Sequence, residues 1–315
     1  MPRLNTTCLF VYYSPVTCTG PKEHPFAGQG AVLFAAFLWS TSGLLIRLLE
    51  WHPLVIAGGR AFIAAIFMLA VRFIVPVPKS TANNKRTSSF WISAFANSVA
   101  VITFVTANRL TASANAVLLQ YSSPIWTALF AWWIIRERPR WEQWGALFLV
   151  IGGMLIFFRE GLGAGTLLGD GVAVFSGICV GIHVVFLRMA KDNNPRDVLL
   201  MSHIIAFIIS IPFMILYPPE FTGNSVFAIL FMGLIQQGVA SLFFAYGIKQ
   251  ISAVQTSLTS TVEPLCNPIW VFFILGEGPS TSAFIGGAMI LAAVLGSSII
   301  VNKRKQLELN RRSLE

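Results

Sequence analysis

Charged residues are scarce in this 315-residue chain: they make up 11% of it, whereas hydrophobic residues make up 55%. A soluble globular domain carries about 25% charged residues, so this composition excludes an ordinary water-exposed surface. The few charges fall between long apolar runs rather than within them, as they do in membrane-spanning helices joined by loops. The sequence therefore predicts an integral membrane protein whose main partner is the lipid bilayer.

The sequence also lacks the short motifs of several enzyme classes. It contains no GxxxxGK[ST] phosphate loop, no HExxH zinc motif and no GxSxG nucleophile turn. Its four cysteines, Cys8, Cys18, Cys179 and Cys266, form no CxxC pair and do not cluster with histidines at zinc-ligand spacing. We therefore expect no catalytic residues, no metal site and no cofactor, and we expect the protein not to be an enzyme.

Ten apolar runs are long enough to cross the hydrocarbon core of a bilayer, which takes roughly 20 helical residues. The predicted spans cover residues 30–49, 54–75, 89–108, 112–135, 141–158, 167–187, 197–217, 224–247, 253–275 and 280–301. Several joins, such as Glu50 to Pro53, are only a few residues long, which makes consecutive helices antiparallel neighbours. The predicted fold is an all-α membrane protein with ten transmembrane helices.

The chain repeats itself with an offset of about 140 residues. Aligned pairs include Asn97 with Gln237, Asn115 with Gln255, Pro124 with Pro264, Glu137 with Glu277 and Pro139 with Pro279. Five spans per half is an odd number, so the halves are predicted to be inverted repeats. The predicted organisation is a leader at 1–29, a first repeat at 30–158, a linker at 159–166, a second repeat at 167–301 and a basic tail at 302–315.

Basic residues fall on one side of this predicted topology. Eighteen of the twenty-two lie in the termini and in alternate loops: Arg3, Lys22, Arg72, Lys79, Lys85, Arg86, Arg136, Arg138, Arg140, Arg188, Lys191, Arg196, Lys249, Lys303, Arg304, Lys305, Arg311 and Arg312. The positive-inside rule then places both termini in the cytoplasm, with the protein in the cell (inner) membrane. The same asymmetry explains the net charge of +9 without a nucleic-acid partner.

Two stretches carry a resemblance to a known family. They are AVLLQYSSPIWTALFAWWIIRERP at 116–139 and SLTSTVEPLCNPIWVFFILGEGP at 257–279, each with a central proline and an acidic end. AVLFAAFLWSTSGLLIR at 31–47 and GGRAFIAAIFMLA at 58–70 are also similar to that family. The chain resembles an EamA-type member of the drug/metabolite transporter superfamily from residue 30 to 301. It departs from an exact repeat where Gly276 and Gly278 replace Arg136 and Arg138.

The resemblance implies a secondary transporter that works by alternating access without ATP and often exports amino acids or other small metabolites. Substrate sites of inverted-repeat transporters lie near the bilayer midplane, where the two halves meet. Polar residues near the middle of the predicted spans are therefore candidates for substrate binding: Asn97, Gln120, Ser123, Gln236, Gln237 and Ser260. Trp39 and Tyr121 are candidates for stacking on a flat or cationic substrate, with core packing as the alternative.

Glu263 is the sharpest candidate, because a carboxylate in mid-membrane costs roughly 2.5 to 3.5 kcal/mol on insertion scales. It is a candidate proton carrier or ligand for a substrate ammonium. The alternative is a structural ion pair, for which Arg60 is a plausible partner. His183 and His203 form a second candidate pair, either relaying protons near neutral pH or simply bonding neighbouring helices.

The leading functional hypothesis is a secondary active exporter of a small-molecule substrate such as an amino acid, with the proton as a candidate coupling ion. A passive channel and a membrane-embedded enzyme acting on lipid are the alternatives from other classes. No clustered His/Asp/Glu constellation favours the enzyme, and saturable, trans-stimulated exchange would separate a carrier from a pore.

If Glu263 is the coupling group, Glu263→Gln is expected to abolish the proton dependence of transport while leaving stable protein, because glutamine keeps the size of the side chain but cannot release a proton. The measurement is substrate flux in proteoliposomes with and without an imposed pH gradient. Full pH-dependent transport by the variant would show that the coupling role is wrong.

Overall fold

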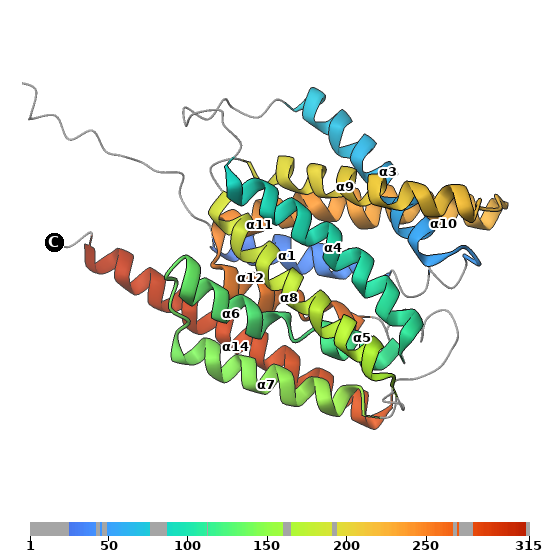
Figure 1. Cartoon of the computed structure of the whole chain (residues 1–315). Coiled ribbons are helices and arrows are strands. Elements are labelled where there is room, and N and C mark those ends of the chain that lie inside the picture. Colours follow the sequence, from blue (N-terminus) through green and yellow to red (C-terminus); the bar gives the residue numbers. More distant parts are fainter. Residues whose placement is uncertain are drawn as a thin grey trace, which may run out of the picture.

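The structure, a computed structural model, describes residues 25–41, 45, 49–75, 87–111, 113–159, 165–190, 194–266, 270 and 280–312. Within these residues every regular element is a helix (Figure 1). Six helical runs are long and apolar enough to cross a membrane: Pro53–Ile74, Ser88–Leu110, Leu167–Met189, Pro195–Leu216, Gly223–Gln250 and Thr281–Val301. The expected all-α membrane protein is confirmed.

The helices of the first half are α1 (Pro25–Trp39), α3 (Pro53–Ile74), α4 (Ser88–Leu110), α5 (Ser113–Gln120), α6 (Ser123–Ile134) and α7 (Trp141–Phe157). α1 begins at Pro25, inside the predicted leader. The continuous helix predicted over 112–135 is instead broken at Tyr121 and Ser122. Pro124 explains the break, because proline has no N–H and its ring clashes with the carbonyl of Gln120, the last residue of α5.

The helices of the second half are α8 (Leu167–Met189), α9 (Pro195–Leu216), α10 (Gly223–Phe231), the π-helix η2 (Met232–Val239), α11 (Ala240–Gln250), α12 (Ala253–Ser260) and α14 (Thr281–Arg312). α10, η2 and α11 form one continuous run. The sequence predicts one continuous helix over 253–275, but α12 ends at Ser260, four residues before Pro264. Pro268, Gly276, Glu277, Gly278 and Pro279 lie outside the described residues. α14 continues through the basic residues of the predicted tail to Arg312.

The most extensive helix contacts join one half of the chain to the other. α4 packs on α8, α1 on α11, α3 on α9 and α7 on α14. Figure 1 shows α7 and α14 side by side along one edge of the bundle. Their approach depends on Gly153 and Gly286, because a Cβ on Gly286 would clash with the carbonyl oxygen of Gly153. Small residues allow this close packing where lipid supplies no hydrophobic force between helices.

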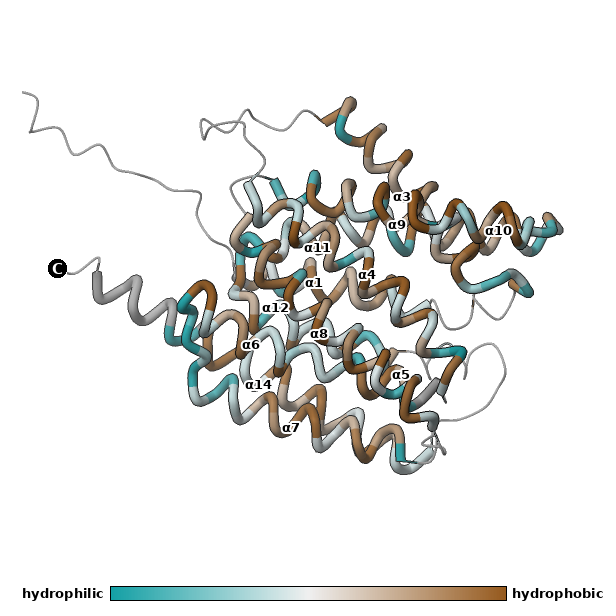
Figure 2. Tube along the Cα trace, viewed as in Figure 1, coloured by the Kyte–Doolittle hydropathy of each residue, from teal (hydrophilic) through white to brown (hydrophobic). Residues whose placement is uncertain are grey.

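The outer surface of the bundle is apolar, and many of the side chains buried inside it are small. Trp133, Phe148 and Phe284 are all more than two-thirds exposed, whereas the buried apolar residues are rich in alanine, such as Ala35, Ala94 and Ala128. The hydropathy colouring shows apolar segments along the length of the helices, with polar colours concentrated towards their ends (Figure 2). This is the arrangement of a protein whose surrounding solvent is hydrocarbon.

Ion pairs between described residues join the halves at one end of the bundle. They are Arg72 with Asp197, Arg188 with Glu137 at 3.5 Å, and Arg304 with Glu142 at 2.5 Å. Nη1 of Arg188 also donates to the carbonyl oxygens of Ile248 and Lys249 at 2.9 and 3.0 Å, so it satisfies orphan carbonyls at the end of α11. The arginine-rich ends of the helices thus hold the halves together on this side, which we call the basic end.

Gly286→Val is expected to destabilise the protein by about 1–3 kcal/mol, because the added methyl groups would press on the backbone of α7. Thermal unfolding in detergent should show a fall in Tm of about 2–5 °C. Gly296→Val is the matched control on the same helix, since a Cβ there meets nothing within 4 Å. Equal effects of the two substitutions would mean that the α7–α14 contact is not limited by backbone approach.

Candidate functional site

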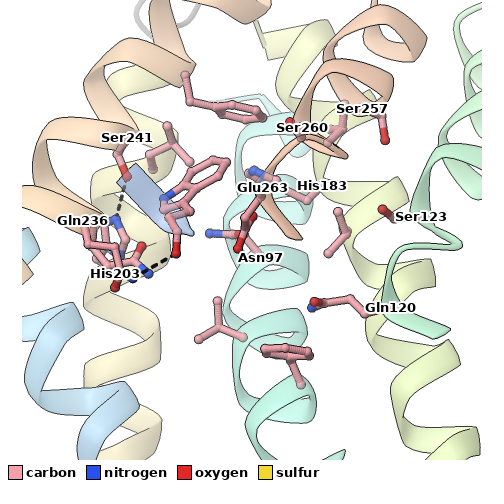
Figure 3. A pocket seen from close by; sticks show the side chains of 18 of the residues that line it. Asn97, Gln120, Ser123, His183, His203, Gln236, Ser241, Ser257, Ser260 and Glu263 are labelled. Atoms are coloured by element: carbon pink, nitrogen blue, oxygen red, sulfur yellow. Dashed lines mark hydrogen bonds between the residues drawn. The ribbon is translucent and has the colours of Figure 1, made fainter. Parts of the chain in front are cut away.

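A cavity of about 190 Å³ lies among the helices of both halves. Its lining comprises Trp39, Arg60, Asn97, Val101, Phe104, Gln120, Tyr121, Ser123, Val180, His183, Val184, Leu199, His203, Gln236, Gln237, Ser241, Phe244, Ser257, Ser260 and Glu263. Figure 3 shows labelled side chains from several helices facing a common space. The volume is below the roughly 300–1,000 Å³ of drug-sized sites, which favours a small ligand.

All twelve residues singled out from the sequence line this one cavity. The cavity also includes Ser241, Ser257 and an apolar wall with Phe104 and Phe244, none of which is predicted from the sequence. Helical spacing offered a signal for both serines, because Ser241 lies four residues after Gln237 and Ser257 three residues before Ser260. No such signal marked the apolar wall, since its residues resemble those that face lipid.

Breaks in the helices surround the cavity. α1 ends at Trp39, α5 gives way to α6 at Tyr121, and α12 ends at Ser260. The freed carbonyl of Trp39 accepts a hydrogen bond from Nε2 of Gln236 at 3.1 Å. Irregular backbone at membrane depth is tolerated only where protein or a water-filled cavity satisfies its polar groups. These breaks therefore indicate a site rather than a simple scaffold.

The two glutamines lie on the π-helix η2, a rare conformation that is frequent at functional sites. Gln236 is 1% exposed, and its Oε1 has no hydrogen-bond partner among the described residues, while its Nε2 is held by Trp39. No hydrogen bond of the Gln237 side chain is found in the described part of the chain. η2 thus brings one anchored amide and one free amide to the cavity wall.

The amides of the first half are tied to neighbouring helices. Nδ2 of Asn97 donates to the hydroxyl of Ser202 on α9 at 3.0 Å. Nε2 of Gln120 donates to Ser176 on α8 at 3.0 Å, and Ser176 in turn donates to the carbonyl oxygen of Ala100 at 2.8 Å. These two amides therefore have a packing role as well as a position on the cavity wall.

Two opposite charges lie on the cavity wall. The phenol of Tyr121 and the guanidinium of Arg60 both interact electrostatically with the carboxylate of Glu263. Arg60 is 7% exposed, and its pair with Glu263 is not among the ion pairs within 4.0 Å in the described residues. Glu263 thus shares the cavity wall with these two groups without a direct ion pair to Arg60.

The two histidines are both buried at the cavity and bonded across helices. Nδ1 of His183 lies 3.0 Å from both the hydroxyl and the carbonyl oxygen of Ser93 on α4. Nε2 of His203 lies 3.1 Å from the hydroxyl of Ser241 on α11, a contact drawn in Figure 3. These are the interhelical bonds expected of a structural histidine, although both rings also face the space that holds Glu263.

No group of three or more His, Cys, Asp or Glu side chains able to hold a metal ion is found in the described ranges. Cys179 and Cys266 are free thiols. Cys8 and Cys18 lie outside these ranges.

Comparison with known proteins identifies the class. The sequence pattern of the EamA-like transporter family matches residues 26–159 and again residues 167–299. The chain belongs to this family. It is a multi-pass membrane protein, and the transporter role of its relatives points away from an enzyme.

Curated relatives match almost end to end. An uncharacterized Bacillus subtilis transporter, YwfM, is 27% identical in an alignment 292 residues long that covers 88% of this chain and 95% of that protein. An uncharacterized transporter of Archaeoglobus fulgidus is 25% identical over 273 residues, covering 85% of this chain and 95% of that protein. A solved crystal structure aligns with a TM-score of 0.76 over 88% of this chain and 98% of that one; at 17% identity it supports the fold alone.

Gln237→Ala is expected to raise the apparent KM several-fold with unchanged protein yield, because this free amide has only the cavity to bond and one hydrogen bond contributes about 1 kcal/mol. Asn97→Ala should also raise KM more than it lowers yield, but with a measurable loss of Tm because it leaves Ser202 without its donor. Transport kinetics and thermal unfolding check both variants.

Ser98→Ala is the matched control for the structural component. Its hydroxyl donates to the carbonyl oxygen of Ser202 at 2.7 Å, one residue along α4 from Asn97, yet it does not line the cavity. It should lower Tm without changing KM. If both amide variants lose yield and keep the wild-type KM, the amides are structural contacts only.

Proposed function

We propose that this protein is a secondary active transporter that exports a small metabolite, such as an amino acid, by alternating access around the central cavity. The observation that carries the proposal is the cavity itself: a small space with an apolar wall and several polar groups, among them one carboxylate and one guanidinium, walled by helices of both halves and surrounded by helix breaks. The outward direction rests on the family resemblance.

The proposed architecture is ten spans in two inverted five-helix repeats, 30–158 and 167–301, joined by the linker 159–166. Its support is that helix contacts come in exchanged pairs. α4 packs on α8 as α11 packs on α1, α5 packs on α8 as α12 packs on α1, and α4 packs on α9 as η2 packs on α3. Corresponding helices also contact each other directly, as α3 does with α9 and α7 does with α14, and exchanging the two halves leaves these contacts unchanged. A two-fold relation between the halves accounts for all of these pairings, and rocking about it would open the cavity to alternate sides.

In the proposed orientation the basic end faces the cytoplasm of the cell (inner) membrane, with both termini on that side. Substrate binds between the aromatic wall, which includes Trp39 and Phe244, and the polar wall that carries Gln236, Gln237 and Glu263. Glu263 is the proposed coupling group, since a mid-membrane carboxylate that faces a cavity can carry a proton between the two sides. The Tyr121 hydroxyl would hold that carboxylate in place.

Counterflow in proteoliposomes tests the proposal. Vesicles loaded with unlabelled substrate should take up external radiolabelled substrate faster than empty ones, with saturable kinetics, because a carrier returns faster when loaded. The panel should cover amino acids and other small metabolites, with protein-free liposomes as control. Flux that rises linearly with concentration and is not trans-stimulated would favour the passive channel. No flux for the whole panel with folded protein would count against transport.

A further inference from the structure

Arg60 is the charged group of the cavity to which the proposed cycle gives no role. It lies on α3, lines the cavity and is 7% exposed. Among the described residues no hydrogen bond or ion pair of its guanidinium is found; the arginines in ion pairs there are Arg72, Arg188 and Arg304. A guanidinium stays charged and carries five N–H donors, so its burial without an acceptor is costly unless a further group supplies one.

Glu263 does not supply that acceptor. Its attraction to Arg60 is electrostatic, and no ion pair within 4.0 Å joins the two in the described residues. The cavity therefore presents a positive group and a negative group that remain separate. A ligand carrying an anionic group would accept hydrogen bonds from the Arg60 guanidinium.

The corresponding helix of the other half shows that packing alone does not require an arginine. Arg60 lies seven residues after Pro53, the first residue of α3, and Ser202 lies seven residues after Pro195, the first residue of α9. Ser202 accepts a hydrogen bond from Asn97, whereas Gln237, the repeat counterpart of Asn97, makes no such bond to Arg60. On α9, the residue at this position is Ser202, which is hydrogen-bonded to the amide of Asn97. On α3, the residue at the same position is Arg60, whose guanidinium lies on the cavity wall.

We propose that Arg60 binds a carboxylate of the transported molecule, so that the substrate class is small carboxylate-bearing metabolites. The planar fork of a guanidinium matches a carboxylate with two parallel N–H···O bonds, and burial in a low dielectric strengthens them. The inference rests on the proposed function and deepens it. The carboxylate can belong to a zwitterionic amino acid, whose ammonium would face Glu263, or to a simple organic acid.

Three matched compounds distinguish these sources: phenylalanine, phenylalaninamide and 3-phenylpropanoate, which carry both charges, only the ammonium and only the carboxylate. Alanine and leucine with their corresponding analogues extend the series to smaller side chains. Binding to the purified full-length protein in detergent is measured by calorimetry, and flux is measured by counterflow. Wild-type protein should bind the carboxylate-bearing compounds. A preference for phenylalanine over 3-phenylpropanoate identifies a zwitterion, and equal binding identifies a simple acid.

Arg60→Gln should weaken binding of the carboxylate-bearing compounds by at least about tenfold and change that of the amide less than about twofold, because only the charged bidentate contact is lost. Arg72→Gln, on the same helix but at the basic end, is the control and should leave all affinities unchanged. Wild-type carboxylate binding by folded Arg60→Gln overturns the proposal. If that variant fails to fold, Arg60→Lys is used, and unchanged carboxylate affinity there overturns it equally.

Failure of this inference is distinguishable from failure of the proposed function. Saturable, trans-stimulated flux of compounds that lack a carboxylate, with no binding of those that carry one, overturns the role of Arg60 and leaves the transporter intact. Absence of flux for every compound counts against the transporter. Even then, binding of the carboxylate-bearing compounds by the wild-type protein, lost in Arg60→Gln, would still support the carboxylate subsite. No binding of any compound to the wild-type protein overturns the carboxylate subsite as well.

Discussion

The constraint on which this structure depends is that hydrocarbon offers no hydrogen bonds. Every polar group at membrane depth must be satisfied by protein or by the contents of a cavity. Many polar side chains in the bundle meet this demand across helices, as Asn97 does with Ser202 and His203 does with Ser241, and others bond a carbonyl of their own helix, as Thr103 does with Val99. In the described part of the chain, the Arg60 guanidinium, the Gln237 amide and Oε1 of Gln236 have no such partner, and all three residues lie on the wall of one cavity. A small molecule bound there could satisfy them.

The same constraint explains the irregular backbone around that place. Pro124 ends α5 by removing a donor and crowding the carbonyl of Gln120, and the π-helix η2 alters the side-chain directions that an α-helix would give Gln236 and Gln237. A straight bundle would point these amides wherever the 3.6-residue period dictates. Broken helices bring them, Tyr121 and the carbonyl of Trp39 to a shared space, and glycines allow α7 and α14 to pack closely beside it.

Much of the site could be predicted from the sequence, because a polar residue in the middle of an apolar run is conspicuous. Asn97, Gln120 and Glu263 stood out for this reason, and they line one cavity with the nine other selected residues. Ser241 and Ser257 were missed because a serine can satisfy itself on its own helix and so gives a weak signal. The helix breaks were missed because an apolar run reads as continuous across a proline, and the π-helix has no sequence signature that separates it from an α-helix.

The sequence by itself determined the solvent of this protein, its helical class and its family, because hydropathy and a repeated motif are properties of the linear chain. It also determined the charge asymmetry in which IRERPRW keeps its arginines and ILGEGPS has none. Only the tertiary structure decided which polar groups hydrogen-bond to one another and which are left without such a partner. It placed Glu263 on the cavity wall without a direct ion pair to Arg60, and it joined Arg188 to Glu137 across the halves. Such pairings depend on distances of a few ångströms between helices far apart in sequence, and no linear pattern carries those distances.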